Sequence, residues 1–429
     1  SGVEWIGEIP EDWDIYRNKN AFICNKEIVG KNSKSTQLLS LTTGGIKCKD
    51  INNAEGKLPE SFDTYQYVKK NDVVMCLFDL DMSAVFSGIS QYDGMISPAY
   101  KVLSCQDRAN PLFIHYWFSY IFDGRKFNHY AKNIRYTLNY NEFATLPILL
   151  PPKTTQQRIA SYLDKKCSKI EETIQNQQLV IEKLKAYKQS LITEAVTGKI
   201  KIENGKVCGE YESYKDSGVE YLGKIPLDWN IKRLRYIGKC QNGISKGGEF
   251  FGSGYPFVSY GDVYNNLVLP ETVSGLIDST HEEQENYSVK AGDIFFTRTS
   301  ETIEEVGFTS VCLKTIENAT FAGFVIRVRP FTDELIPDYS KYYFSSDAHR
   351  RFFVKEMNLV TRASLSQDLL KRLPVLIPSK EKQKEIADYL DKKCTAIDTV
   401  IEQKQKLIKK LTEYKKSLIY ECVTGKKEI

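Results

Sequence analysis

The sequence predicts an α+β protein in which two globular domains, each a mixed sheet with helices, are joined by two long helices. We expect the helices to form an antiparallel intramolecular coiled coil with pseudo-twofold symmetry. Two internal repeats and one heptad pattern support this prediction. The chain has 429 residues, of which 41% are hydrophobic, and this is enough material for two sizeable cores.

Two repeats mark the boundaries of each domain. In the opening repeat, residues 1–17 (SGVEWIGEIPEDWDIYR) return at residues 217–233 as SGVEYLGKIPLDWNIKR. In the closing repeat, residues 146–199 return at residues 373–426, with more than half of the positions identical. The opening offset is 217 − 1 = 216 and the closing offset is 373 − 146 = 227, so the second copy gained about eleven residues between the repeats.

The stretches between the repeats, residues 18–145 and 234–372, have diverged. Repeats that are kept around stretches that have diverged predict two different binding domains held in one arrangement. The alternative is a tandem structural repeat whose loops have drifted. We expect domains at residues 1–150 and 206–377 and helical segments at residues 151–205 and 378–429.

Local patterns predict mixed secondary structure inside both domains. Apolar runs that follow turn residues favour strands at residues 72–78, 99–103, 256–260, 293–299 and 324–329. Aromatic-rich helical patterns occur at residues 112–122 and 337–353.

A heptad pattern predicts the long helices. Alternate steps of four and three residues give an apolar seam over about four heptads, with polar interruptions at the same places in both copies. The seam consists of Leu163, Ile170, Ile174, Ile181, Leu184 and Leu191 in the first copy and of Leu390, Ile397, Ile401, Ile408, Leu411 and Leu418 in the second. The matched pattern favours pairing of the two copies with each other, and a homodimeric coiled coil between two chains is the alternative.

Composition excludes several classes of protein. No apolar run is long enough to span a membrane, nothing at the N-terminus resembles a signal peptide, and none of the ten cysteines forms a Cys-x-x-Cys pair. We therefore expect a cytoplasmic protein with reduced thiols and no metal site. The formal net charge of +4 permits nucleic-acid binding without requiring it.

An ordered set of motifs occurs twice. Each copy has an Ile-Pro-x-Asp-Trp opening, an Asp-Val or Asp-Ile strand start, a Leu-Pro-x-x-x-Pro stretch and a helix that begins Lys-x-x-Gln-x-x-Ile-Ala-x-Tyr-Leu, at residues 153–163 and 380–390. The whole chain thus resembles the specificity subunit of type I restriction-modification systems. Thr155 and Lys382 depart from the acidic residue that precedes the helical glutamine in that family, which affects helix capping rather than function.

The resemblance implies a DNA-reading subunit without catalysis of its own. In that family, two target-recognition domains each read one half of a split, asymmetric double-stranded DNA site. The helices set the gap between the halves and dock two methyltransferase (M) subunits, which carry S-adenosylmethionine. Restriction and translocase (R) subunits join some of these complexes. We expect no cofactor on this chain.

Residue type and position suggest the DNA contacts, because Arg and Lys pair with guanine or phosphate and Asn with adenine. Arg298 and Thr299 leave an apolar run as a polar segment, and a surface arginine is the alternative reading. Weaker candidates are lysines in early loops of each domain, namely Lys47, Lys49 and Lys246.

Polar loops precede the closing repeat in both copies, at residues 132–139 and 359–366. Arg135 aligns with Arg362, and an arginine kept in both copies favours a phosphate contact. The neighbouring positions differ between the copies, which suits sequence readout. The candidates in these loops are Lys132, Arg135, Tyr136, Thr137, Asn139, Arg362, Ala363 and Ser364.

Two other classes of function remain open. A standalone DNA-binding or scaffold protein would bind tightly without a partner, which the mild charge disfavours. A metal-dependent nuclease would use an acidic cluster, at residues 79–81 or 301–305. Neither class accounts for helices that are kept while the domains diverge.

Overall fold

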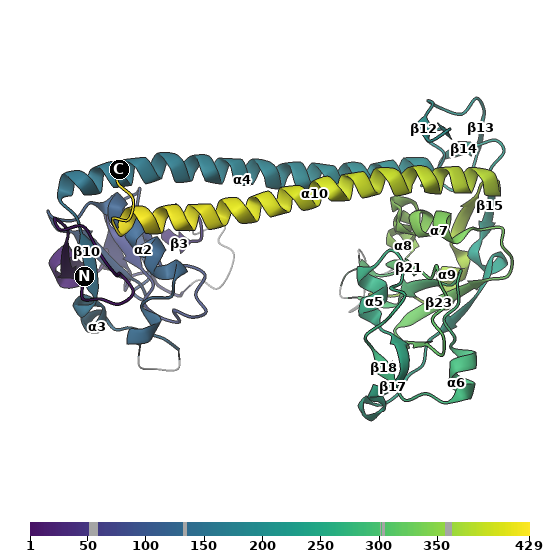
Figure 1. Ribbon diagram of the computed structural model, residues 1–429, viewed down its shortest axis with the longest axis horizontal. Coiled ribbons are helices and arrows are strands. Elements are labelled where there is room, and N and C mark those ends of the chain that lie inside the picture. The colour runs from purple at the N-terminus through teal and green to yellow at the C-terminus, as the bar shows by residue number, and fades with distance from the viewer. Residues whose placement is uncertain (51–58, 132–134, 301, 303–304, 357–362) are drawn as a thin grey trace. The chain divides into compact units, whose positions relative to one another are not determined.

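The computed structural model describes residues 1–50, 59–131, 135–300, 302, 305–356 and 363–429, without the side chain of Ala363 (Figure 1). It contains two compact units. Unit 1 comprises residues 1–178 and 405–429, and unit 2 comprises residues 179–404. Two helices, α4 (Lys153–Val196) and α10 (Lys380–Val423), run from one unit into the other and join them. Each unit therefore contains part of both long helices, where the sequence suggested separate helical segments.

Unit 1 is built on a four-stranded antiparallel sheet of order β2-β9-β6-β7. These strands are β2 (Phe22–Asn25), β9 (Lys101–Cys105), β6 (Val73–Met75) and β7 (Ser87–Ile89). Three strand pairs complete the unit: β1 (Asp14–Arg17) with β10 (Pro147–Leu150), β3 (Leu39–Thr42) with β4 (Gly45–Cys48), and β5 (Gln66–Val68) with β8 (Gly94–Ile96). Its shorter helices are α1 (Asn18–Ala21), α2 (Pro111–Asp123) and α3 (Tyr140–Thr145).

The core of unit 1 gathers around α2. Asn110 caps this helix by accepting hydrogen bonds from the backbone N–H groups of Leu112 and Phe113, and Pro111 supplies the fixed φ of a first helical residue. The fully buried Trp117 and its neighbours pack in one cluster with residues from α4 and from the end of α10. Both long helices are thus part of the hydrophobic core of unit 1.

Unit 2 is also built on a four-stranded antiparallel sheet, but several of its other elements differ from those of unit 1. Its four-stranded antiparallel sheet has the order β16 (Gly238–Asn242), β23 (Val325–Pro330), β19 (Ile294–Thr297) and β21 (Thr309–Val311). A second sheet contains β18 (Leu276–Ile277), β17 (Phe251–Val258) and β22 (Thr320–Phe321). Strand pairs join β15 (Asn230–Arg233) to β25 (Pro374–Ile377), β20 (Thr299–Ser300) to β24 (Ala363–Ser364), β11 (Ile202–Glu203) to β12 (Lys206–Val207), and β13 (Tyr214–Asp216) to β14 (Lys224–Pro226). The helices are α5 (Tyr260–Asn265), α6 (His281–Asn286), α7 (Pro337–Ser345), α8 (Asp347–Glu356) and α9 (Gln367–Arg372).

The expected single helix over residues 337–353 is wrong, because the chain forms α7 and α8 there. Ser346 adopts an extended conformation and ends α7, and both its backbone N–H and its hydroxyl donate to the carbonyl of Tyr343. The expected strand over residues 256–260 stops at Val258. Ser259 instead caps α5 and accepts a hydrogen bond from the backbone N–H of Asp262.

In each unit, a strand of the opening repeat pairs with a strand of the closing repeat. In unit 1, Ile15 of β1 pairs with Leu149 of β10. In unit 2, Ile231 of β15 pairs with Leu376 of β25. These pairs lie at equivalent positions of the repeats, so the chain was duplicated together with a contact that closes each domain.

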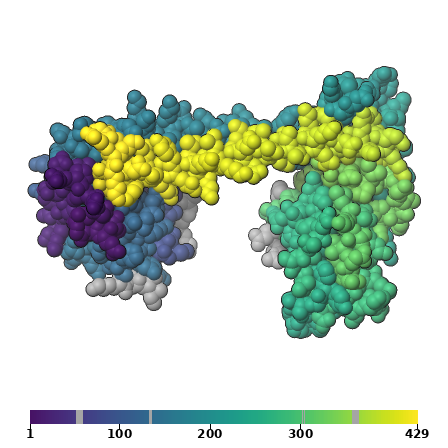
Figure 2. Space-filling view, in the orientation of Figure 1, coloured from purple at the N-terminus to yellow at the C-terminus, as the bar shows by residue number. Residues whose placement is uncertain are grey.

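The tryptophan of the opening repeat packs against the glycine that ends a long helix. A Cβ atom on Gly198 would lie 2.4 Å from Pro226 and 3.4 Å from the ring of Trp229. A Cβ atom on Gly425 would lie equally close to the matching proline and tryptophan of unit 1, Pro10 and Trp13. Figure 2 shows the end of α10 (yellow) against the N-terminal residues (purple) within unit 1.

The long helices pair in antiparallel fashion within each unit, as expected. In unit 1, Glu171 of α4 forms an ion pair with Lys415 of α10. In unit 2, Lys188 of α4 lies 2.6 Å from Asp398 of α10. The two ion pairs are equivalent, because each carboxylate occupies the same position in its copy. Of the twelve seam side chains, eight are buried and four half-buried, the latter being Ile174, Leu184, Ile408 and Leu411.

Candidate nucleic-acid interface

The central strand of each unit ends at a polar loop, and we call this junction the strand-exit site. In unit 2, the backbone N–H of Leu365 donates to the carbonyl of Arg298 at 2.7 Å, and Thr299 pairs with Ser364 across β20 and β24. Three residues that the sequence singled out, Arg298, Thr299 and Ser364, therefore lie together. Arg298 is half-buried, and its guanidinium has no hydrogen bond or ion pair among the described residues.

Unit 1 forms the same junction with other residues. The backbone N–H of Leu138 donates to the carbonyl of Leu77 at 2.8 Å, which matches the bond between Leu365 and Arg298. The hydroxyl of Thr137 accepts from the backbone N–H of Asp79 at 3.3 Å. Leu77 thus occupies the position of Arg298, and an apolar side chain replaces a cation at the equivalent place.

The remaining loop candidates have mixed surroundings. Arg135 and Tyr136 are exposed, and Tyr136 has a positive φ of 47°. Asn139 caps α3, because its side-chain oxygen accepts from the backbone N–H of Glu142 at 3.0 Å. Of the two polar atoms in its side chain, the amide nitrogen remains available for a contact with DNA. Lys132 and Arg362 lie outside the described residues.

The early-loop lysines do not lie at the strand-exit site. Lys47 is exposed on β4, and the backbone N–H of Lys49 donates to Leu38 at the end of the β3–β4 hairpin. Lys246 forms a 2.6 Å ion pair with Glu283 and stacks over the ring of Phe250. Its ammonium already has partners within the protein.

Tyrosines support the strand-exit site of unit 2. Tyr260 stacks on Tyr264 with a centroid distance of 5.8 Å, and its hydroxyl donates to the carbonyl of Thr299 at 2.9 Å. Burial raises the pKa of Tyr260, so the phenol keeps its proton and this hydrogen bond near neutral pH. This hydrogen bond therefore holds the loop that carries Arg298 in place.

Sequence reasoning missed a cavity at the strand-exit site of unit 1. The cavity measures about 480 Å³ and is lined by Leu77, Phe78, Thr137, Leu138 and Asn139, together with Cys24, Lys26, Gln66, Ala99, Lys101, Tyr140 and Asn141. Lys26 follows the end of β2 and Lys101 begins β9, and these two strands pair. The lysine at each of these strand ends is the sequence feature that could have indicated the cavity.

The glutamine shared by both closing repeats acts as a buried clamp. Gln383 is completely buried, and its side-chain oxygen accepts from the backbone N–H of Ile336 at 2.9 Å. Its amide nitrogen donates to the carbonyls of Glu334 and Pro378 at 2.8 and 2.9 Å. The equivalent Gln156 makes the matching three hydrogen bonds in unit 1. This glutamine fixes the start of each long helix against its domain.

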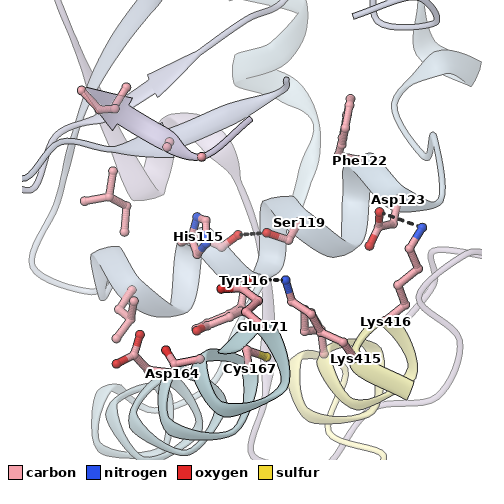
Figure 3. Close-up of a pocket in the computed structure, with 18 of the residues that line it drawn as sticks. His115, Tyr116, Ser119, Phe122, Asp123, Asp164, Cys167, Glu171, Lys415 and Lys416 are labelled. Carbon is pink, nitrogen blue, oxygen red and sulfur yellow. Dashed lines mark hydrogen bonds and ion pairs between the residues drawn. The ribbon is translucent and has the colours of Figure 1, made fainter. Parts of the chain in front are cut away.

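Figure 3 shows where the long helices meet the domain in unit 1. Glu171 and Lys415 point toward one another, and Lys416 of α10 lies 3.2 Å from Asp123 of α2. These ion pairs line a cavity of about 500 Å³. Burial lowers the pKa of His115 in its wall, so this imidazole is neutral near pH 7.

The described residues contain no group of three or more His, Cys, Asp or Glu side chains that could hold a metal ion. Of the two acidic segments considered for a nuclease, residues 301–305 lie partly outside the described residues. All ten cysteines are free thiols. In the portion of the chain that the structure covers, no helix has the length and apolar character needed to cross a membrane.

Comparisons with known proteins point in one direction. Residues 226–411 match the family model described as the type I restriction modification DNA specificity domain. The chain is 23% identical to the EcoKI specificity subunit of Escherichia coli K12 over 66% of its length and 58% of that protein. It is 24% identical to the MjaVIII specificity subunit of Methanocaldococcus jannaschii, over 66% of this chain and 63% of that one. The chain thus spans about three fifths of these curated relatives.

A solved structure shares the fold over nearly the whole chain. It comes from work on complex assembly and conformational transition of a type I R-M system, and its TM-score is 0.71 at 15% identity. The match covers 97% of this chain and 98% of the other. The predicted fold class of two α+β domains joined by long helices is confirmed.

Proposed function

We propose that the chain is a specificity subunit of a type I restriction-modification system and that it selects the DNA sequence on which such a complex acts. Each unit reads one half of a bipartite, asymmetric site on double-stranded DNA. The long helices set the gap between the halves and dock two methyltransferase subunits. Restriction subunits add to the same complex where a host encodes them. Since the proposed target is DNA, we place the protein in the cytoplasm.

One observation carries this proposal: the two strand-exit sites have the same backbone contacts and different side chains. Leu77 and Arg298 receive equivalent hydrogen bonds from Leu138 and Leu365. Side chains that project into a DNA groove decide which bases are accepted, while the backbone sets their position. Equal frames with unlike side chains are therefore suited to two unlike half-sites.

We propose that the chain has no catalytic role of its own. S-adenosylmethionine and the methyl-transfer chemistry then belong to the methyltransferase subunit. Mapping methylated bases in a host that carries both subunits tests the proposal. A standalone DNA-binding protein would instead give tight, specific binding without the methyltransferase.

Arg298→Ala is expected to relax the sequence preference of one half-site only. A well-placed arginine contributes about 1–3 kcal/mol of discrimination against a wrong base. Binding of the assembled complex to duplexes that vary one base pair at a time measures this loss. Arg135→Ala, which removes an exposed arginine of unit 1, is the comparison, and we expect it to weaken binding to all sequences alike. Unchanged preference at both halves in Arg298→Ala would remove this arginine from the readout.

Removing one heptad from each long helix is expected to shorten the permitted gap. Residues 172–178 of α4 and 408–414 of α10 lie opposite one another within unit 1, in the register given by the pair of Glu171 and Lys415. Seven helical residues span about 10 Å, or about three base pairs of DNA. We expect methylation at a gap about three base pairs shorter, or loss of assembly. Methylation at the original gap would contradict a spacing role.

A further inference from the structure

The cavity at the strand-exit site of unit 1, which we call the lysine cavity, is positively charged. Its lining residues include Lys26 and Lys101 and no Asp or Glu. Neither lysine has an ion pair among the described residues. Four other cavities in the described part of the chain also contain cations, but each has at least one carboxylate in its wall. The lysine cavity therefore carries two cations without local compensation.

Lys26, Lys101 and Cys24 line the same cavity. Burial raises the pKa of the Cys24 thiol, and the positive charges of Lys101 and Lys26 both oppose this rise. Both lysines are therefore close enough to act on the same sulfur atom. A single anion bound in this cavity would interact with both cations.

The charge of the cavity favours a phosphate over a base. Lysine binds phosphate as a point charge without requiring the planar geometry of a base edge. Two of the amide side chains in the wall are also partly engaged within the protein, because the amide nitrogen of Gln66 donates to the carbonyls of Ser97 and Tyr100 and the oxygen of Asn139 caps α3.

Unit 2 has other residues at the positions of the two lysines. Cys24 pairs with Leu103 in unit 1, and Cys240 pairs with Val328 in unit 2. Two residues beyond each cysteine stand Lys26 and Asn242, and two residues before the paired positions stand Lys101 and Ile326. An amide and an apolar side chain thus replace the two lysines, and unit 2 has its cation, Arg298, at the position of Leu77 instead.

We infer that the lysine cavity binds one backbone phosphate of the DNA half-site that unit 1 reads. This inference rests on the proposed function. The cavity lies beside Thr137 and the exposed Tyr136, so a phosphate held there would fix the register of the strand whose bases face this loop. Unit 2 must fix its half-site by other contacts.

The double variant Lys26→Met with Lys101→Met tests the inference in the chain assembled with its methyltransferase subunit. We expect the slope of log K against log salt concentration to become shallower by about 1, since one phosphate contact contributes about 0.9. Affinity should fall by the same factor on the split target and on a random duplex. The control is Lys69→Met with Lys70→Met, which removes two exposed lysines from the turn before β6, at the opposite end of that strand.

The outcomes separate the inference from the proposed function. If the unaltered complex has no preference for a split target, the proposed function fails. If the preference is present but the double variant keeps the original slope, the lysine cavity is not a phosphate site. A change of base preference without a change of slope would also overturn the inference, because the lysines would then read bases.

Alkylation of Cys24 gives a second test on the unaltered chain. Cys24 is partly exposed and lies in the lysine cavity, whereas Cys208 is exposed in unit 2. We expect the split-target duplex to slow alkylation of Cys24 several-fold and to leave Cys208 unchanged. Equal rates with and without the duplex would overturn the inference, and so would protection by inorganic phosphate but not by duplex DNA.

Discussion

Gln383→Leu is expected to lower the free energy of unfolding of unit 2 by about 4 kcal/mol. Leucine has nearly the same size, so the change mainly removes hydrogen bonds. It leaves the N–H of Ile336 and the carbonyls of Glu334 and Pro378 without their partner in a fully buried position. Each buried polar group that loses its partner costs about 1–3 kcal/mol. The start of α10 should therefore detach from the domain first.

Denaturant unfolding, combined with hydrogen exchange resolved by unit, measures this loss. Gln156→Leu is the matched variant, and its destabilisation should be similar in size and confined to unit 1, because it removes the equivalent three hydrogen bonds. Gln403→Leu, at an exposed position of α10, should change stability by less than about 0.5 kcal/mol. A loss below about 1 kcal/mol in Gln383→Leu would show that the clamp is dispensable.

Trp229→Ala is expected to destabilise unit 2 by about 3–5 kcal/mol, the usual cost of truncating a buried aromatic side chain. Trp229 is fully buried, packs against the glycine that ends α4, and lies 5.8 Å from the ring of Tyr211. Its loss leaves a cavity where the opening repeat contacts Gly198. The connection between the long helix and the domain should loosen as a result.

Calorimetric melting and hydrogen exchange of residues near Gly198 check this prediction. Trp229→Phe keeps an aromatic ring and should lose less stability than the alanine variant. Trp13→Ala should affect unit 1 less, since Trp13 is 7% exposed and Trp229 is 0% exposed. Native exchange rates around Gly198 in Trp229→Ala would contradict the proposed packing role.

The domain boundaries and the long helices could be predicted because the sequence contains each of them twice. The heptad seam and the repeated boundaries indicate the long helices and their antiparallel pairing, which the ion pair between Lys188 and Asp398 illustrates in unit 2. The role of Gln383 could not be predicted, because its partner Glu334 lies 49 residues away in the sequence. The break at Ser346 was missed because apolar residues continue with helical spacing on both sides of it.

The candidate site could be predicted in part. The sequence singles out Arg298 as a polar residue after an apolar run and Ser364 as a variable position in the loop before the closing repeat, and only the pairing of β20 with β24 brings them together. Lys26 and Lys101 were missed, since 75 residues separate them and the pairing of β2 with β9 unites them. Contacts between distant segments depend on strand register, which local patterns do not specify.

Under the proposed function, the two units read two unlike half-sites from one common frame. This can be tested by mapping methylated bases across the genome of a host that carries this chain and a partner methyltransferase subunit. We expect a single bipartite, asymmetric motif with a fixed gap, and Arg298→Ala should degrade one half of it. Methylation at one continuous motif, at a symmetric motif or without sequence preference would contradict the proposed function.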